Sequence, residues 1–164
     1  MDRIGKAAES MTEADIQPIF LRLKKILVAT DGSPPAVKAT NYAIGLAKAF
    51  KAEVLAVYVN GNQNQGRHHT GSRGQTSFCG VHPSEAGLVV AKALGEKNGV
   101  KVYTTILTGS VAKQILNVAE AEEIDILVIG ESGCSGSSKI SLGSIAETLL
   151  RISTTPILVI RRDR

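Results

Sequence analysis

The residues best suited to chemistry form a glycine-rich turn toward the C-terminal end of the chain. Gly130, Gly133, Gly143 and Ser144 follow the spacing G-x2-G-x9-G-S, and the turn begins where the apolar run 124–129 ends. Glycines at the end of a buried strand let backbone N–H groups approach an anion, because no Cβ stands in the way. The spacing therefore predicts a cradle for the phosphates of a nucleotide.

Hydroxyl side chains in and beside this turn support the same interpretation. Serines supply further donors at positions 132, 135, 137, 138 and 141. Ser144 and Glu147 also form a capping-box pattern, which predicts a helix that starts there. The Ser144 hydroxyl can therefore serve as a cap, as a phosphate ligand at a helix N-terminus, or as both in turn.

Asp31 is a second candidate ligand, in the sequence Asp31-Gly32-Ser33 after the apolar run 26–29. Asp-Gly-Ser is ordinary turn chemistry, in which the carboxylate accepts backbone amides. The position of Asp31 at the carboxyl end of a strand favours contact with a ligand as well, because ligands of open parallel sheets bind at those ends.

The histidines and cysteines raise the question of a metal site or a redox site. His68, His69, Cys79 and His82 include a C-x2-H pair, but their spacing matches no zinc module, so we prefer a solvated loop and predict no metal site. Cys134 lies in the glycine turn, where a lone intracellular thiol is usually inert.

No catalytic constellation accompanies the cradle. The Walker pattern G-x4-G-K-S/T is absent, no G-x-G-x-x-G follows a strand, and none of the histidines lies near the cradle in sequence. We therefore expect the nucleotide to be a ligand, with no catalytic residues and at most slow ATP hydrolysis.

Alternating strands and helices must position these residues. Apolar runs without polar alternation predict buried strands at 26–29, 54–59, 124–129 and 157–160, and a less apolar strand at 102–107. Helices are expected after Ser33 with Pro34-Pro35, after Pro83 up to Gly99, after Ser110, and from Ser144. Strict alternation of this kind predicts an α/β fold, with an open parallel sheet of five strands and helices on both faces.

Composition limits the class of protein. A chain of 164 residues with 43% hydrophobic residues suits one domain. A net charge of +4 and an aromatic content of 4% without tryptophan give little basis for nucleic-acid binding, and we interpret the basic end at 161–164 as solvated rather than as a nucleic-acid tail. No run reaches the roughly 18 apolar residues that span a bilayer, and two cysteines without a secretory segment predict a cytoplasmic protein.

Two segments lie outside the alternating pattern. Residues 1–23 form a polar extension, with a short helix at 13–23 that Pro18 interrupts, and we assign it no function. Residues 61–81 are rich in Gly, Asn, Gln, His and Ser and predict a long mobile loop. The domain itself is expected at residues 24–164.

Taken together, these features resemble the universal stress protein family, in its ATP-binding branch. Besides the glycine spacing, the resemblance rests on KILVATDGS at 25–33, VYV at 57–59, DILVIG at 125–130 and TPILVIR at 155–161. It implies an adenine nucleotide α-hydrolase-like sheet in the order 3-2-1-4-5. It also implies ATP, ADP or AMP, with Mg²⁺ as an accompanying ion, held between the first and fourth strands.

The resemblance also implies roles for individual residues. Ala29, Thr30 and Asp31 match the end of the first strand, where the Asp lies against adenine or ribose, and Val59 matches the residue that meets adenine. Gly130 and Gly133 match the ribose and phosphate turn, and Gly143, Ser144 and Ile145 match the helix start that receives phosphates. This sequence departs from the commonest turn, which has Thr or Ser, then His or Arg, and finally Arg where Glu131, Ser132 and Cys134 stand here. A carboxylate beside the site repels phosphate unless it points away.

The expected function is a nucleotide-gated regulatory module in stress response, acting on a protein partner that the sequence does not identify. The resemblance implies a homodimer, and the apolar last strand, residues 156–161, is the edge that a second copy would cover. Two alternatives stay open. One is a dimeric scaffold of the same fold that binds no nucleotide; the other is an adenylate-forming enzyme, against which the absence of S-G-G-x-D-S after the first strand argues.

Overall fold

The described residues form a five-stranded parallel sheet with two helices on each face. The computed structural model describes residues 22–61, 83–132 and 142–161. The elements are β1 (Lys25–Ala29), α2 (Pro34–Phe50), β2 (Glu53–Asn60), α3 (Pro83–Asn98), β3 (Val102–Thr108), α4 (Val111–Ala121), β4 (Ile126–Gly130), α5 (Ser144–Ile152) and β5 (Ile157–Ile160). The strand order is β3-β2-β1-β4-β5, which confirms the expected fold.

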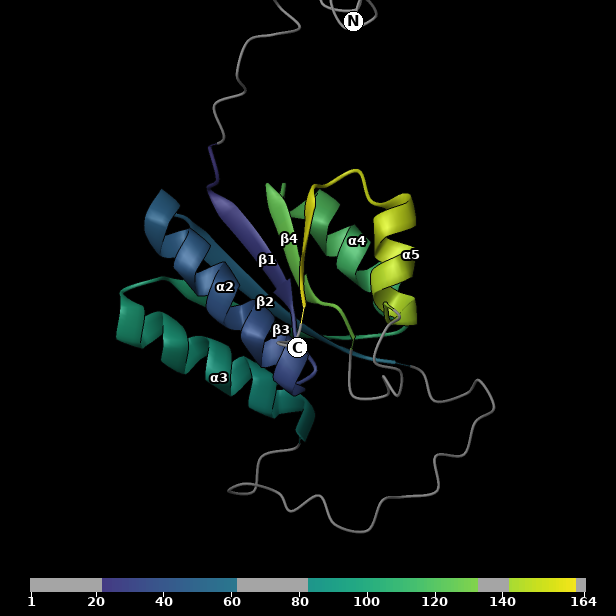
Figure 1. Cartoon of the computed structure of the whole chain (residues 1–164), viewed down its shortest axis with the longest axis horizontal. Coiled ribbons are helices and arrows are strands. Elements are labelled where there is room, and N and C mark those ends of the chain that lie inside the picture. Colours follow the sequence, from purple (N-terminus) through teal and green to yellow (C-terminus); the bar gives the residue numbers. More distant parts are fainter. Residues whose placement is uncertain (1–21, 62–82, 133–141, 162–164) are drawn as a thin grey trace, which may run out of the picture.

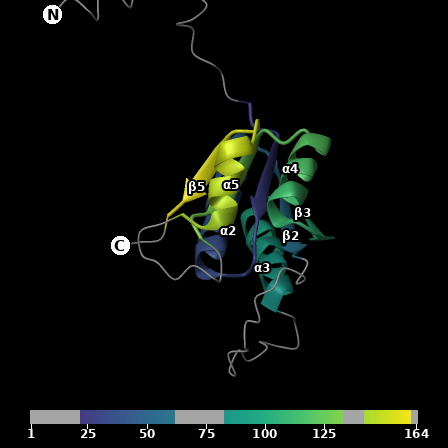
Figure 2. The same ribbon diagram turned by 90° about the vertical axis from the view of Figure 1, so that its right-hand side faces the viewer.

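The helices divide into two layers. Helices α2 and α3 lie on one face of the sheet and α4 and α5 on the other (Figure 1), and a quarter turn brings α4 and α5 in front of the strands (Figure 2). Each layer has its own core. Ile26, Val28 and Val54 face α2 and α3, whereas Leu27, Val57 and Leu127 face α4 and α5. Buried apolar side chains on both faces explain why these strands are continuous apolar runs.

The central pair of strands is aligned at its amino end by one carboxylate. Asp125 Oδ2 accepts hydrogen bonds from the backbone amides of Lys24, at 2.6 Å, and Lys25, at 2.8 Å. From there β1 and β4 run in parallel, with Ile26 beside Ile126 and Val28 beside Val128. Strand β4 begins at Ile126, later than expected, because the Ile124 amide donates to the Ala119 carbonyl and ends α4.

The helices end near the residues that the sequence predicts, but the expected cap hydrogen bonds are not formed. Gly99 has φ +68° directly after α3, as expected for a C-terminal glycine. Ser33 and Ser110 stand at the N-cap positions of α2 and α4, yet neither side chain makes a cap hydrogen bond. Lys51 ends α2 in the left-handed conformation at φ 56°, which a residue with a side chain adopts at a cost.

Candidate functional site

The carboxyl end of β1 forms one wall of the candidate site. Thr30 is 4% exposed, and its amide donates to the Val57 carbonyl of β2 at 2.9 Å. Asp31 Oδ1 accepts the Ser33 amide at 3.0 Å, so the turn interpretation of this carboxylate is correct. Ala29 and Val59 belong to the same apolar cluster on the α4 and α5 face. The four predicted residues therefore lie at one end of the sheet: Ala29 ends β1, Thr30 and Asp31 follow it, and Val59 is near the end of β2.

The carboxyl end of β4 lies directly beside this wall. The register that pairs Val28 with Val128 brings Gly130 level with Thr30. A Cβ on Gly130 would lie 2.9 Å from the carbonyl carbon and oxygen of Pro35, in the first turn of α2. This glycine is therefore needed for the close packing of α2 over the end of β4, whatever else it contacts.

Helix α5 starts against the same turn. The Gly143 amide donates to the Glu131 carbonyl at 2.8 Å, which brings the start of α5 to the end of β4. Gly143 is the N-cap and Ser144 the first helical residue, so the expected capping box at Ser144 is wrong. The bond to Glu131 fixes how the chain enters the helix and moves the cap one residue back. Glu147 bonds through its amide to the Gly143 carbonyl instead.

Two of the predicted phosphate ligands in α5 are open to solvent. Ser144 is exposed, and the Ile145 side chain is 39% exposed. No side chain of the described residues caps α5, so its first amides keep their capacity to donate. At a helix N-terminus such amides and the positive end of the helix dipole favour an anion.

An ion pair accounts for the carboxylate that departs from the family pattern. Glu131 is 7% exposed, and its Oε2 lies 3.2 Å from Arg161 Nε at the end of β5. The Arg161 carbonyl in turn accepts a hydrogen bond from Lys38 Nζ of α2, at 2.8 Å. Arg161 thus ends the last strand as a partner of Glu131 rather than as a fully solvated residue. The charge of Glu131 is largely balanced within the protein.

A buried hydroxyl lies at the same end of the sheet. Ser33 is 5% exposed, and its Oγ makes no hydrogen bond to any residue of the described structure. An N-cap hydroxyl accepts from the amide of the second or third helical residue, and Pro35 at the second position of α2 removes one of these two donors.

Sequence reasoning missed Gly87, which belongs to α3. A Cβ at Gly87 would overlap Thr30 Oγ1 and lie 2.9 Å from the Gly32 amide nitrogen. Helix α3 therefore packs directly against the turn that follows β1. The available signal was a glycine inside a helix, where it costs about 1 kcal/mol relative to alanine.

The structure brings together eight of the predicted residues: Ala29, Thr30, Asp31, Val59, Gly130, Gly143, Ser144 and Ile145. Gly133 and Cys134 lie outside the described residues, as do His68, His69, Cys79 and His82. Within the described part of the chain, no three His, Cys, Asp or Glu side chains form a group that could hold a metal ion.

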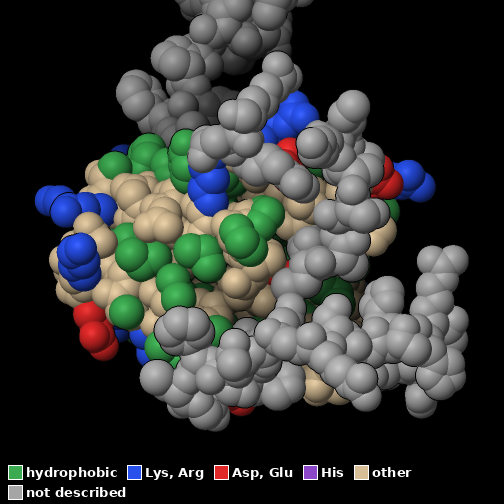
Figure 3. Space-filling view, turned by 60° about the horizontal axis from the view of Figure 1, so that its bottom comes forward, with side chains coloured by type: hydrophobic (Ala, Val, Ile, Leu, Met, Phe, Trp, Pro, Cys, Tyr) green, Lys and Arg blue, Asp and Glu red, His purple; other side chains and the backbone are tan. Residues whose placement is uncertain are grey.

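At the end of the molecule that carries this site, the part not covered by grey atoms in the space-filling view (Figure 3) shows no continuous basic surface. Figure 3 brings this end forward and shows Lys and Arg side chains mostly around the outline, mixed with Asp and Glu, with hydrophobic side chains between them. In the ranges 22–61, 83–132 and 142–161, no helix is both long and apolar enough to cross a membrane.

Comparisons with known proteins agree with this architecture. The sequence profile of the universal stress protein family matches residues 22–161. A universal stress protein of Methanocaldococcus jannaschii is 35% identical over 142 residues, which cover 86% of this chain and 84% of that protein.

Solved structures show the same fold. A universal stress protein in complex with cAMP has a TM-score of 0.63 at 21% identity, covering 85% of this chain and 98% of that one. A universal stress protein of Archaeoglobus fulgidus in complex with dAMP has a TM-score of 0.62 at 18% identity, covering 85% and 99%. On its fold, its sequence profile and its relatives, the chain belongs to the universal stress protein family.

Proposed function

We propose that the protein binds an adenine nucleotide, ATP or AMP, at the carboxyl ends of β1 and β4 and acts as a nucleotide-gated regulatory module. The observation that carries this proposal is the meeting of three chain segments at one end of the sheet. The turn after β1, the turn after β4 and the uncapped start of α5 are joined by the strand register and by the bond from Gly143 to Glu131. The cAMP and dAMP complexes of two structural neighbours support adenine nucleotides as the ligand class.

In this proposal each segment binds one part of the nucleotide. Ala29, Thr30, Asp31 and Val59 contact adenine and ribose, and Gly130 and Gly133 let the backbone approach the sugar and phosphates. Gly143, Ser144 and Ile145 receive phosphate at the start of α5. Arg161 supports binding indirectly, because it pairs with Glu131 and reduces the repulsion between that carboxylate and phosphate.

A charge at the start of α5 tests the site without disturbing the fold. Ser144 is exposed, and an aspartate in the first turn of a helix stabilises it by about 0.3–1 kcal/mol. Ser144→Asp should therefore keep or raise the melting temperature while it repels phosphate. The matched control is Ser110→Asp, which adds the same charge at the exposed N-cap of α4, at the end of β3.

The assay is a thermal-shift titration with ATP, ADP, AMP and cAMP, with and without Mg²⁺. A ligand that binds only the folded state at 100 times its Kd stabilises that state by about 2.7 kcal/mol. The unsubstituted protein and Ser110→Asp should show this rise, and Ser144→Asp should lose most of it. If no nucleotide shifts the unsubstituted protein, the scaffold alternative is favoured; if Ser144→Asp responds fully, phosphate binds elsewhere.

We further propose a homodimer through residues 156–161. Strand β5 is at the edge of the sheet, and Ile157, Leu158 and Val159 are only half-buried. The carbonyls of Pro156 and Ile160 accept bonds from β4, so the alternation of a strand directs the Ile157 and Val159 amides outward.

Val159→Pro removes one outward donor, and sedimentation should then show monomer where the unsubstituted protein and Val159→Ala sediment as dimer. A monomeric unsubstituted protein at micromolar concentration would contradict this proposal.

A further inference from the structure

A groove lies on the α4 and α5 face of the sheet, away from the nucleotide site. Its floor is formed by Leu55 of β2 with Tyr103 and Leu107 of β3, its wall by Val118 and Ala121 of α4, and one end by Lys25. Its volume is about 630 Å³. We refer to the surface formed by these six residues as the groove.

The groove is a part of the sheet that its own helices leave open. On the opposite face α3 packs against both β2 and β3, whereas on the groove side α4 contacts the same two strands less extensively. On the groove side Tyr103 is 46% exposed, Ala121 is exposed and Leu55 and Leu107 are half-buried. A parallel sheet is normally covered on both faces, so this surface has the character of a helix-packing site without its helix.

The chain contains a segment of suitable pattern that precedes the domain. Apolar residues fall at i, i+3, i+4, i+7 and i+10 from Ile4, namely Ile4, Ala7, Ala8, Met11 and Ala14. This is the spacing of an amphipathic helix with one narrow apolar stripe, and its small residues allow close approach to a sheet. The family profile begins only at Arg22, so the stripe is additional to the family domain.

The length and direction of this N-terminal segment also match those of the groove. A helix over residues 3–16 would be about 21 Å long, and the seven residues of β3 span about 23 Å. In this proposal Pro18 confines the helix to residues before it, in place of the short helix expected at 13–23, and residues 17–21 would bridge at most about 17 Å to Arg22, near the Lys25 end of the groove. The segment would then run antiparallel to the strands, as α4 does when it returns from the end of β3 to the start of β4.

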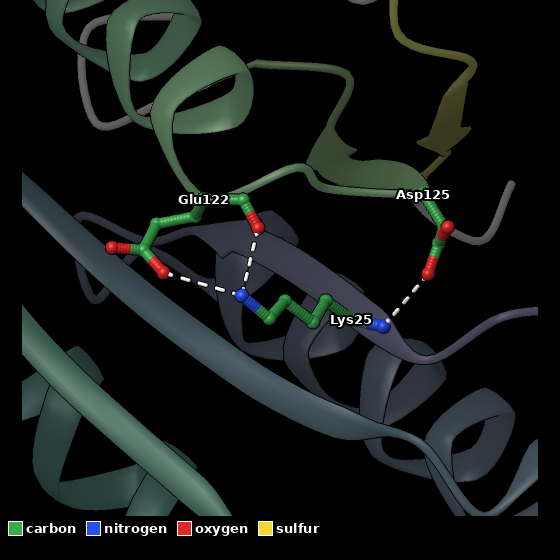
Figure 4. Close-up of polar contacts among 3 residues, drawn as sticks. All are labelled: Lys25, Glu122 and Asp125. Carbon is green, nitrogen blue, oxygen red and sulfur yellow. Dashed lines mark hydrogen bonds and ion pairs between the residues drawn. The ribbon is translucent and has the colours of Figure 1, made fainter.

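Two ion pairs lie at the Lys25 end of the groove, and the lysines in them keep exposed side chains that can also contact an acidic residue of the stripe. Lys25 Nζ contacts the Glu122 carbonyl at 2.9 Å and Glu122 Oε2 at 3.4 Å (Figure 4). Lys101 bonds Glu53 at 2.9 Å and lies 5.0 Å from the centre of the Tyr103 ring; contact with Tyr103 and then with Glu53 raises the pKa of Lys101 above its usual value. Asp15 falls on the stripe one turn after Met11, at the end of the segment nearest these two cations.

We propose that residues 3–16 bind the groove of their own chain as an amphipathic helix, and so complete the helix layer over β2 and β3. The occupant is part of the same molecule, which makes binding intramolecular and independent of protein concentration. A second copy of the chain and a foreign helix are the competing occupants that the experiment must separate.

Paramagnetic relaxation in the full-length chain tests the proposal. A nitroxide is attached at Glu13→Cys, on the polar face of the segment, with Cys79→Ser and Cys134→Ser to remove the native thiols. Amide signals of Tyr103, Leu107, Val118 and Ala121 should broaden. Met11→Asp places a charge in the stripe and should abolish the broadening, whereas Ser10→Asp adds the same charge on the polar face and should preserve it.

A mixed sample distinguishes binding within one chain from binding between two chains. It contains chains that carry the nitroxide but no ¹⁵N, together with ¹⁵N-labelled chains that carry no nitroxide. Broadening that persists in this mixture would assign the groove to a second molecule and overturn the proposal, as would the absence of broadening in the singly labelled protein. Hydrogen exchange on chains with native cysteines gives a second measurement: Met11→Asp, but not Ser10→Asp, should speed exchange across β3 and α4. Equal exchange in both variants would also overturn it.

Discussion

Three glycines in helices offer a matched test of how α3 supports the proposed nucleotide site. Gly45 in α2 has nothing within 4 Å of an added Cβ. At Gly87 a Cβ would overlap Thr30 Oγ1 and lie 2.9 Å from the Gly32 nitrogen, and at Gly95 it would overlap Val102 and lie 2.9 Å from the Val100 carbonyl. Alanine is substituted at each position in turn.

The expected magnitudes follow from two opposing terms. Each substitution gains about 1 kcal/mol of helix propensity. Overpacking at Gly87 and Gly95 costs about 1–3 kcal/mol, since backbone atoms must move as well as side chains. For a chain of this size, 1 kcal/mol shifts the melting temperature by about 2–4 °C. Gly45→Ala should therefore raise the melting temperature by about 2–4 °C. The melting temperatures of Gly87→Ala and Gly95→Ala should lie about 2–12 °C below that of Gly45→Ala.

The site is tested by the difference between the two destabilised variants. Only Gly87→Ala displaces the turn that carries Thr30 and Asp31, whereas Gly95→Ala disturbs α3 near the start of β3. Calorimetric scans with and without ATP should show a reduced nucleotide response in Gly87→Ala and a normal one in Gly95→Ala. If Gly87→Ala were as stable as Gly45→Ala, the packing of α3 on the β1 turn would be wrong. Equal nucleotide responses would instead remove this turn from the site.

Three further substitutions have defined outcomes. Lys51→Gly should stabilise the protein by about 1 kcal/mol in chemical denaturation, because glycine adopts the left-handed conformation at φ 56° without strain; an unchanged midpoint would contradict this. Arg161→Ala should destabilise it by about 1–2 kcal/mol, since Glu131 is 7% exposed and loses a charged partner, and Arg161→Lys should recover part of the loss; equal losses in both variants would show that charge is not the cause. Ser33→Ala should be neutral or stabilising by up to about 1 kcal/mol, because Oγ has no partner among the described residues; a clear loss of stability would reveal one.

The sequence predicted the strands well because burial dictated their composition. Runs such as Ile26–Val28 face helices on both sides, so every position is apolar and the run cannot be mistaken for a half-exposed strand. Proline after Ser33 and glycine after Asn98 marked helix ends through local backbone geometry. The strand order, in contrast, came from the resemblance to a family, since no local pattern distinguishes 3-2-1-4-5 from other orders.

The caps and the ion pair could not be predicted from residue types alone. Serine is a residue type favoured at the N-cap, but the direction in which the chain enters α5 is set by a bond between Gly143 and Glu131. Likewise Arg161 meets Glu131 because β4 and β5 pair Gly130 with Ile160, which places the next two residues side by side. Both features depend on the alignment of distant segments.

The single carboxylate at Asp125 has a consequence for how the sheet assembles. One of its oxygens holds two successive amides, so β1 can join β4 in only one alignment that keeps both bonds. A slip by one residue would turn every side chain of β1 to the opposite layer. The alignment that brings Thr30 and Gly130 level at the carboxyl end of the sheet therefore depends on two bonds made at its amino end, a full strand length away.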